Sequence, residues 1–235
     1  AQMGAAMSRV LAAHQPNYLP WLGLFHKVGQ ADVWVVADDV QYTKHGFINR
    51  NRVRTAAGWQ WLTVPVRSKG RGLQSIEQVQ IDTDGNWRNK HLNALRWNYA
   101  NAPYFAHYEG LLTEYYARDW QRLVDLNMEF CLFVLGELQI EVEVRRTSEF
   151  DVREERTDRL LDLAIACNCG VYLAGSGSSK QYLDPTVFEK AGIECRFSSF
   201  RHPVYRQCHP GFAPAMTTLD LLLNCGPASR EVLFG

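Results

Sequence analysis

The chain has 235 residues, of which 46% are hydrophobic and 21% are charged. Both fractions are close to globular averages, so disordered and fibrous classes are disfavoured. The 25 basic and 25 acidic residues cancel, which argues against a protein that binds polyanions or membranes through bulk charge. The six cysteines include no CxxC pair, so we expect no structural metal. No apolar run is long enough to cross a bilayer, so we expect no membrane span. A cytoplasmic protein with reduced cysteines is therefore predicted.

The first forty residues predict a compact βαβ unit. The expected elements are a strand over 9–13, a short helix over 22–28 and a buried strand over 33–37. Pro16 and Pro20 prevent regular pairing between the first strand and the helix. Ligands bind beyond the carboxyl ends of such parallel strands, so His14, Asp38 and Asp39 are expected close to a site.

The rest of the chain combines a helical section with a second βαβ pattern. The expected elements are a strand over 59–66, helices over 86–100, 104–117 and 119–138, a half-exposed strand over 139–146, a helix over 156–167, a strand over 171–175, a helix that Asp184 caps and Pro185 opens, and a strand over 193–197. This predicts an α/β fold with a mostly parallel sheet built from βαβ units and an inserted helical section. We expect one domain over 7–235, with the helical insertion at about 86–138.

The segment HQPNYLPWLG is the densest cluster of polar and aromatic residues. His14, Gln15, Asn17, Tyr18 and Trp21 lie in a loop that two prolines stiffen, which lowers the entropy cost of holding several groups in place. His14 can serve as a general acid or base near neutral pH. The structural alternative is a hydrogen-bonded histidine at a strand end.

A charged segment follows the second strand. Asp38 and Asp39 suit either an ammonium or Mg²⁺, or alternatively cap a turn. The window 40–76 has no acidic residue and seven basic ones, namely Lys44, Arg50, Arg52, Arg54, Arg67, Lys69 and Arg71. Phosphate is the natural ligand of such a cluster, and a solvated basic surface is the alternative.

Two later loops are weaker candidates. The GSGSS turn containing Ser176 and Ser178 follows a strand and could bind an anion through its backbone, but it is not a P-loop. The stretch FRHPVYRQ again places a histidine before a proline just after a strand, so His202 and Tyr205 form a second candidate pair. A plain loop is the alternative in both places.

The segments HQPNYLPWLGLFHK, DDVQYTKHGFINRNRV, GWQWLTVPV, NYANAPYF, FRHPVYRQ and LDLLLNCGP, in this order, resemble the WbqC-like protein family from Arg9 to Leu233. That family is similar in context to proteins of O-antigen, surface-sugar and natural-product gene clusters. The resemblance implies attachment of a glycyl or other acyl group, as an amide, to an amino sugar or similar amine. The family pattern falls on His14, Gln15, Pro16, Tyr18, Pro20, Trp21, Asp38, Asp39, Gln41, Asn49, Arg50, Asn51, His202, Pro203 and Tyr205.

A fainter similarity links the opening strand, histidine loop and helix to adenylate-forming nucleotidylyltransferase-like folds. Their HxGH signature is incomplete here, because Asn17 stands in place of the second histidine. The use of ATP and Mg²⁺ therefore stays open.

The leading hypothesis is an enzyme that transfers an acyl or aminoacyl group to the amine of a nucleotide-linked sugar or small metabolite. A thioester, ATP plus acid, or aminoacyl-tRNA is the expected donor, so tRNA is a possible partner. The predicted catalytic residues are His14, Tyr18, Asp38, Asp39 and His202, and the predicted substrate-binding residues are Gln15, Asn17, Trp21, Gln41, Lys44, Asn49, Arg50, Asn51, Arg52, Ser176, Ser178 and Tyr205. The alternatives are an ATP-using ligase and a noncatalytic protein that binds RNA or a phosphorylated ligand through the basic window with Phe47, Trp59 and Trp61.

Overall fold

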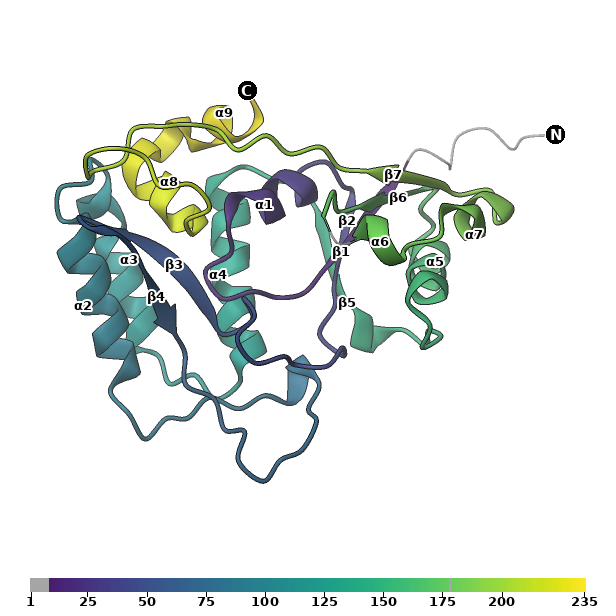
Figure 1. Ribbon diagram of the computed structural model, residues 1–235, viewed down its shortest axis with the longest axis horizontal. Coiled ribbons are helices and arrows are strands. Elements are labelled where there is room, and N and C mark those ends of the chain that lie inside the picture. The colour runs from purple at the N-terminus through teal and green to yellow at the C-terminus, as the bar shows by residue number, and fades with distance from the viewer. Residues whose placement is uncertain (1–8, 178) are drawn as a thin grey trace. The chain divides into compact units, whose positions relative to one another are not determined.

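Figure 1 shows the computed structural model, which describes residues 9–177 and 179–235. The chain divides into two compact units, each assembled from three stretches of sequence. Unit 1 comprises Ala1–Gln15, Gly23–Asp39 and Ile140–Arg201, and unit 2 comprises Pro16–Leu22, Val40–Gln139 and His202–Gly235. A single domain over 7–235 stays a prediction.

Unit 1 is an α/β structure around a parallel sheet. Its elements are β1 (Val10–His14), α1 (Leu22–Val28, of which the first residue falls in unit 2), β2 (Val33–Val36), β5 (Glu143–Arg146), the short 3-10 helix η2 (Thr147–Glu149), α5 (Arg156–Ala166), β6 (Val171–Ala174), α6 (Ser179–Tyr182), α7 (Pro185–Lys190) and β7 (Glu194–Phe197). In the described part of the chain the sheet has five strands in the order β5-β2-β1-β6-β7, and each strand is parallel to its neighbours. The predicted fold class is confirmed.

The central strands are apolar because helices and neighbouring strands enclose them. Every residue of β2 and of β6 is buried, as expected for parallel strands. On one face, Leu11 and Val35 of the sheet pack in a core with Leu161 of α5 and Phe188 of α7. The Phe188 ring stacks on Tyr172 with 5.1 Å between centroids. The side chain of Asp184 caps α7 by accepting from the Thr186 amide, as predicted.

The strand order determines where unit 1 can hold a ligand. From β1 the chain moves outward in one direction through β2 to β5, and β6 and β7 then build the sheet on the other side of β1. The connections therefore diverge between β1 and β6, and ligands of open α/β sheets bind outside the carboxyl ends of the strands at such a point. His14 is the last residue of β1.

Unit 2 combines a β-hairpin with helices. Its elements are β3 (Arg50–Thr55), β4 (Gly58–Thr63), the 3-10 helices η1 (Ile76–Gln78) and η3 (Gly226–Ala228), and the helices α2 (Trp87–Tyr99), α3 (Phe105–Ala117), α4 (Leu123–Glu137), α8 (Thr218–Cys225) and α9 (Ser229–Phe234). The predicted helical section is present, although α4 begins at Leu123 rather than at 119. Neither β3 nor α8 was predicted from the sequence.

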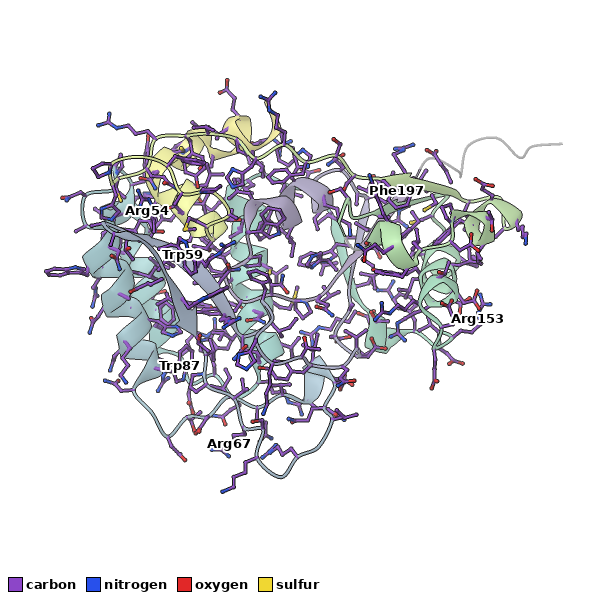
Figure 2. All side chains as sticks on the ribbon, viewed as in Figure 1. Arg54, Trp59, Arg67, Trp87, Arg153 and Phe197 are labelled. Atoms are coloured by element: carbon purple, nitrogen blue, oxygen red, sulfur yellow. The ribbon has the colours of Figure 1, made fainter. Side chains whose placement is uncertain are left out.

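The hairpin has one inward and one outward face. In the antiparallel register Arg52 pairs with Trp61 and Asn51 with Leu62, so alternate residues share a face. Val53 and Leu62 are buried, which places Asn51, Val53 and Leu62 against the core of unit 2. Arg54 and Trp59 lie on neighbouring strands near the turn of the hairpin (Figure 2).

A close approach fixes the end of α8. Gly226 follows the helix with φ of +51°, and an added Cβ would lie 2.5 Å from the ring of Tyr104. Only glycine satisfies both conditions at this position without a shift of the ring.

Among the described residues, no helix combines the length and apolar character that a membrane span requires.

Candidate functional site

His14 presents a lone pair at the carboxyl end of the central strand of unit 1. Its Nδ1 lies 2.8 Å from the carbonyl oxygen of Gln15. A carbonyl only accepts, so Nδ1 carries the proton and donates, and Nε2 is the unprotonated nitrogen. The half-buried imidazole has its pKa lowered from 6.5 to about 4, first by burial and then by the positive charge of Lys27. His14 is therefore neutral near pH 7 and can accept a proton.

Lys27 is a buried cation beside this histidine. Its side chain is 7% exposed, and its Nζ donates a 2.8 Å hydrogen bond to the carbonyl of Ala13. No carboxylate of a described residue forms an ion pair with it. Burial lowers its pKa from 10.5 to about 8, so the ammonium form still predominates at neutral pH. A buried ammonium held by one main-chain carbonyl has donors left for an oxygen atom of a ligand.

Asp38 and Asp39 follow β2, as predicted, but both carboxylates already have partners. Asp38 is fully buried and accepts from the amide and the hydroxyl of Ser148, at 3.2 and 2.9 Å. Asp39 pairs with the guanidinium of Arg159. These contacts hold the turn after β2 against the segments that follow β5 and open α5. They match the turn-cap alternative more closely than a free ammonium site.

The Gly and Ser loop lies next to His14 in the sheet. Ala12 pairs with Leu173 in the β1–β6 register, and continuing that register by two residues places Gly175 opposite His14. Ser176 is exposed just beyond it, whereas Ser178 lies outside the described residues. Unit 1 thus brings His14, Gln15, Lys27, Gly175 and Ser176 to the edge where its strand connections diverge. Across the described ranges, no group of three or more His, Cys, Asp or Glu side chains could hold a metal ion.

The remaining predicted residues belong to unit 2, where Tyr18 is part of a buried relay. The Tyr18 hydroxyl lies 2.8 Å from Nδ1 of His91 and 2.5 Å from the hydroxyl of Tyr116. Because His91 Nε2 must donate to the carbonyl of Thr63, its Nδ1 accepts from Tyr18. Tyr18 then accepts from Tyr116. Burial raises the pKa of Tyr18 and lowers that of His91 to about 4, so the relay is uncharged near pH 7.

His202 and Tyr205 are likewise engaged. Nδ1 of His202 donates to the carbonyl of Pro203, and its Nε2 accepts from the amide of Ala215 at 3.0 Å. Tyr205 is 8% exposed and donates a 2.6 Å hydrogen bond to Asp220. In these contacts both residues stabilise the segment that leads to α8.

Asp220 is the centre of a buried polar network. Its carboxylate accepts from Tyr99, Tyr205 and Gln207, at 2.8, 2.6 and 3.0 Å. The guanidinium of Arg54 donates to Gln207 Oε1 at 3.0 Å, and further donors of Arg54 reach main-chain carbonyls. The network therefore connects a buried cation on β3 to a buried anion on α8 through neutral side chains.

The other predicted ligand-binding residues surround the hairpin. Asn49 donates to the carbonyl of Val64, and Asn51 donates to that of Tyr18. Asn17 is buried, Trp21 forms a bridge with Thr217, and Gln41 forms one with Ser75. Lys44 is exposed, and Arg50 and Arg52 are half-exposed on the outward face of the hairpin.

A model of the WbqC-like protein family matches residues 15–232, nearly the whole chain. The chain belongs to this family. It is also 34% identical over 226 residues to the uncharacterized protein Rv1507c of Mycobacterium tuberculosis (strain ATCC 25618 / H37Rv), an alignment that covers 95% of this chain and 96% of that protein. No solved structure matches the chain significantly. The resemblance seen in the motifs is thereby confirmed.

Lys27 of this WbqC-like protein was not among the site residues predicted from the sequence. The residue lies in the last turn of α1, where a lysine usually complements the helix dipole at the surface. One indication that Lys27 is buried was present in the sequence. It lies on a short helix in which the apolar residues, including the adjacent Val28, are buried. That pattern leaves little surface for a lysine at this place.

Proposed function

We propose that this WbqC-like protein forms an amide, by transferring an acyl or aminoacyl group from an activated donor to the amine of an amino sugar or small metabolite. The proposal places this reaction in the cytoplasm, in surface-polysaccharide or natural-product biosynthesis. The observation that carries it is the pairing of a neutral imidazole with an ammonium at the carboxyl end of β1. Acyl transfer to an amine is accelerated by a base that takes the proton of the attacking nitrogen and by a donor that stabilises the developing oxyanion.

The residues of unit 1 have distinct roles in this reaction. The amine nitrogen attacks the carbonyl carbon, a C–N bond forms, and the π electron pair moves to the oxygen. Lys27 stabilises this negative oxygen. Nε2 of His14 takes the proton from the nitrogen and returns it to the leaving group as the bond from carbon to that group breaks.

The low pKa of His14 restricts which amine can react. A base with a pKa of about 4 cannot deprotonate a free alkylammonium to a useful extent. The nitrogen of the tetrahedral intermediate is more acidic, so the amine must arrive uncharged. Because Asp38 and Asp39 are engaged with Ser148 and Arg159, we assign them to holding the turn after β2 rather than to binding an ammonium.

A direct assay tests the proposal. The purified protein is incubated with a nucleotide-linked amino sugar and, in turn, an acyl thioester, ATP plus a carboxylic acid, and an aminoacyl-tRNA, and products are read by mass spectrometry. We expect an acceptor heavier by the acyl group, with at least about 100-fold less product from His14→Gln. His26→Gln, which changes another histidine near Lys27, is the matched control and retains activity. No product with any donor contradicts the proposal.

A second candidate uses the same edge of unit 1 for ATP-dependent activation of a carboxylic acid. The divergence of the strand connections beside Gly175 favours it, since nucleotides occupy such positions in other open α/β sheets. Asp38 fits Mg²⁺ poorly, because both of its oxygens already accept from Ser148, and one oxygen of Asp39 is paired with Arg159. Pyrophosphate release that depends on both ATP and acid identifies this reaction.

A further inference from the structure

The outward face of the β3–β4 hairpin carries stacked tryptophans and arginines. We define the Trp–Arg face as Phe47, Arg50, Arg52, Trp59 and Trp61. Its three aromatic side chains are strongly exposed for their size, at 45% for Phe47, 45% for Trp59 and 36% for Trp61. Large exposed aromatics that gather in one place mark a binding surface.

The ring of Trp61 lies next to that of Phe47 and also next to that of Trp59. The centroids of Phe47 and Trp61 lie 5.9 Å apart, and those of Trp61 and Trp59 lie 5.5 Å apart with the two tryptophan planes nearly perpendicular. The rigid antiparallel register of β3 and β4 holds Trp59 and Trp61 in place. Little side-chain entropy is therefore lost when a flat ligand stacks on these rings.

The two cations of the face have no acidic partner among the residues that the structure describes. The guanidinium of Arg50 lies 4.2 Å from the Trp61 ring centroid, and that of Arg52 lies 5.1 Å from the Trp59 centroid. Arg52 Nε is buried without a hydrogen-bond partner, and neither arginine forms an ion pair with a described carboxylate. The window 40–76 contains no Asp or Glu. The face therefore favours an anionic ligand that also has flat apolar surfaces.

A groove extends this surface toward α2. Trp59 and Gln60 form one wall, and Lys90 and Trp97 line the other part. Trp97 is 86% exposed, so a further aromatic ring and a further cation are available beyond the hairpin. Both walls belong to unit 2.

We propose that the Trp–Arg face binds an unpaired stretch of single-stranded nucleic acid. Successive bases stack on Phe47, Trp61 and Trp59, while Arg50 and Arg52 contact the phosphates between them. Single-stranded nucleic acids combine flat bases with a regular anionic backbone, which matches the alternation of rings and guanidinium groups here. A duplex hides its base faces and lacks this complementarity. The inference does not depend on the chemistry of His14.

Fluorescence anisotropy on the full chain tests this inference. The probes are labelled single strands of RNA and of DNA, each about ten nucleotides long and of equal sequence, and the corresponding blunt RNA duplex. We expect both single strands to bind more tightly than the duplex, and the stronger of the two identifies the natural ligand. Inorganic phosphate is added as competitor, and it should displace the strand only at concentrations that also screen charge.

Substitutions locate the binding to this face. Trp61→Ala and, separately, Trp59→Ala should weaken binding roughly fivefold to 100-fold, and Trp61→Phe should recover most of the loss. Arg52→Ala should weaken binding and reduce the slope of log affinity against log salt by about 0.7. The matched control is Arg118→Ala, which also removes an arginine stacked on a tryptophan, Trp120, but one neutralised by Glu129.

The following results would contradict the inference. Duplex binding as tight as single-strand binding, or the absence of single-strand binding, excludes the stacking surface. Unchanged affinity in both Trp59→Ala and Trp61→Ala, with folding confirmed by circular dichroism, excludes this face. A loss in Arg118→Ala equal to that in Arg52→Ala shows that only net charge matters and also contradicts the inference.

Discussion

The ammonium of Lys27 lies beside the imidazole of His14, and its positive charge helps to keep that imidazole neutral. Lys27 Nζ is fixed by the carbonyl of Ala13, the residue before His14 on β1. The protein thus keeps a buried cation next to a proton acceptor, and no carboxylate of a described residue forms an ion pair with that cation. Burying a cation without a counter-ion costs free energy, which is characteristic of sites arranged for a ligand.

Removal of Lys27 is expected to separate stability from activity. At pH 7, Lys27→Met should raise the free energy of unfolding by about 1–2 kcal/mol, because an isosteric apolar chain needs no desolvation of an ammonium. Amide formation should fall by roughly 100-fold, since the developing oxyanion loses its cation. Urea unfolding and initial rates measure the two effects. Reduced stability together with full activity would assign Lys27 a structural role.

The pH dependence of kcat/KM should follow the two unusual pKa values. Activity should rise as His14 loses its proton near pH 4 and fall as Lys27 loses its proton near pH 8, on top of the titration of the amine substrate. Lys27→Arg should remove the alkaline limb, because a guanidinium keeps its charge. An acidic limb of the kcat/KM profile near pH 6.5 would mean that the rate depends on a histidine with an ordinary pKa, and this would contradict the role of His14.

Two histidines should make the folded protein sensitive to mild acid. The folded-state pKa of His14 and of His91 is about 4, below the ordinary 6.5, so the unfolded chain binds more protons between these values. Each neutral histidine contributes fully to the free energy of unfolding above pH 6.5. As the pH falls toward 4, the free energy of unfolding decreases by about 3 kcal/mol for each of the two histidines. His91→Gln should flatten this loss in chemical unfolding, whereas His107→Gln on the exposed side of α3 should not. Equal slopes in all three proteins would refute this.

The Asp220 network should behave as one unit. Tyr205→Phe should cost about 1–3 kcal/mol, because a buried carboxylate loses a hydrogen bond. Asp220→Ala and Arg54→Ala should each cost about 3 kcal/mol or more, since each leaves the opposite charge buried. The double variant should cost clearly less than the sum of the two. Additive losses in urea unfolding would show that Arg54 and Asp220 are independent.

The sequence predicted the parallel core well for a physical reason. Runs such as VWVV in β2 and VYLA in β6 are apolar throughout, which is typical of parallel strands that are buried on both faces. The strand β3 was missed because its sequence, RNRVRT, is dominated by charge. Its period of two places Arg50 and Arg52 outward and Val53 inward, a pattern that is clear once β4 is seen opposite.

The candidate site was predicted in part. His14 ends β1 and Gly175 follows β6, and the βαβ patterns predict each of these positions at a strand end. That β1 and β6 are neighbours is seen only in the strand order of the sheet. The partners of Asp38 lie in the segment after β5, more than a hundred residues away, so sequence spacing could not distinguish a cap from an ammonium site. Lys27 was missed because burial of a lysine depends on how its helix meets the sheet. Local sequence does not specify that contact.

Nitrogen-detected NMR of the seven histidine side chains can measure the protonation of His14 itself. With the His14 resonances assigned by their loss in His14→Gln, we expect a proton on Nδ1, an unprotonated Nε2 at pH 7 and titration near pH 4. Lys27→Met should move that titration upward. A proton on Nε2, or titration near 6.5 that ignores Lys27→Met, would contradict the pairing of base and cation on which the proposed amide formation depends.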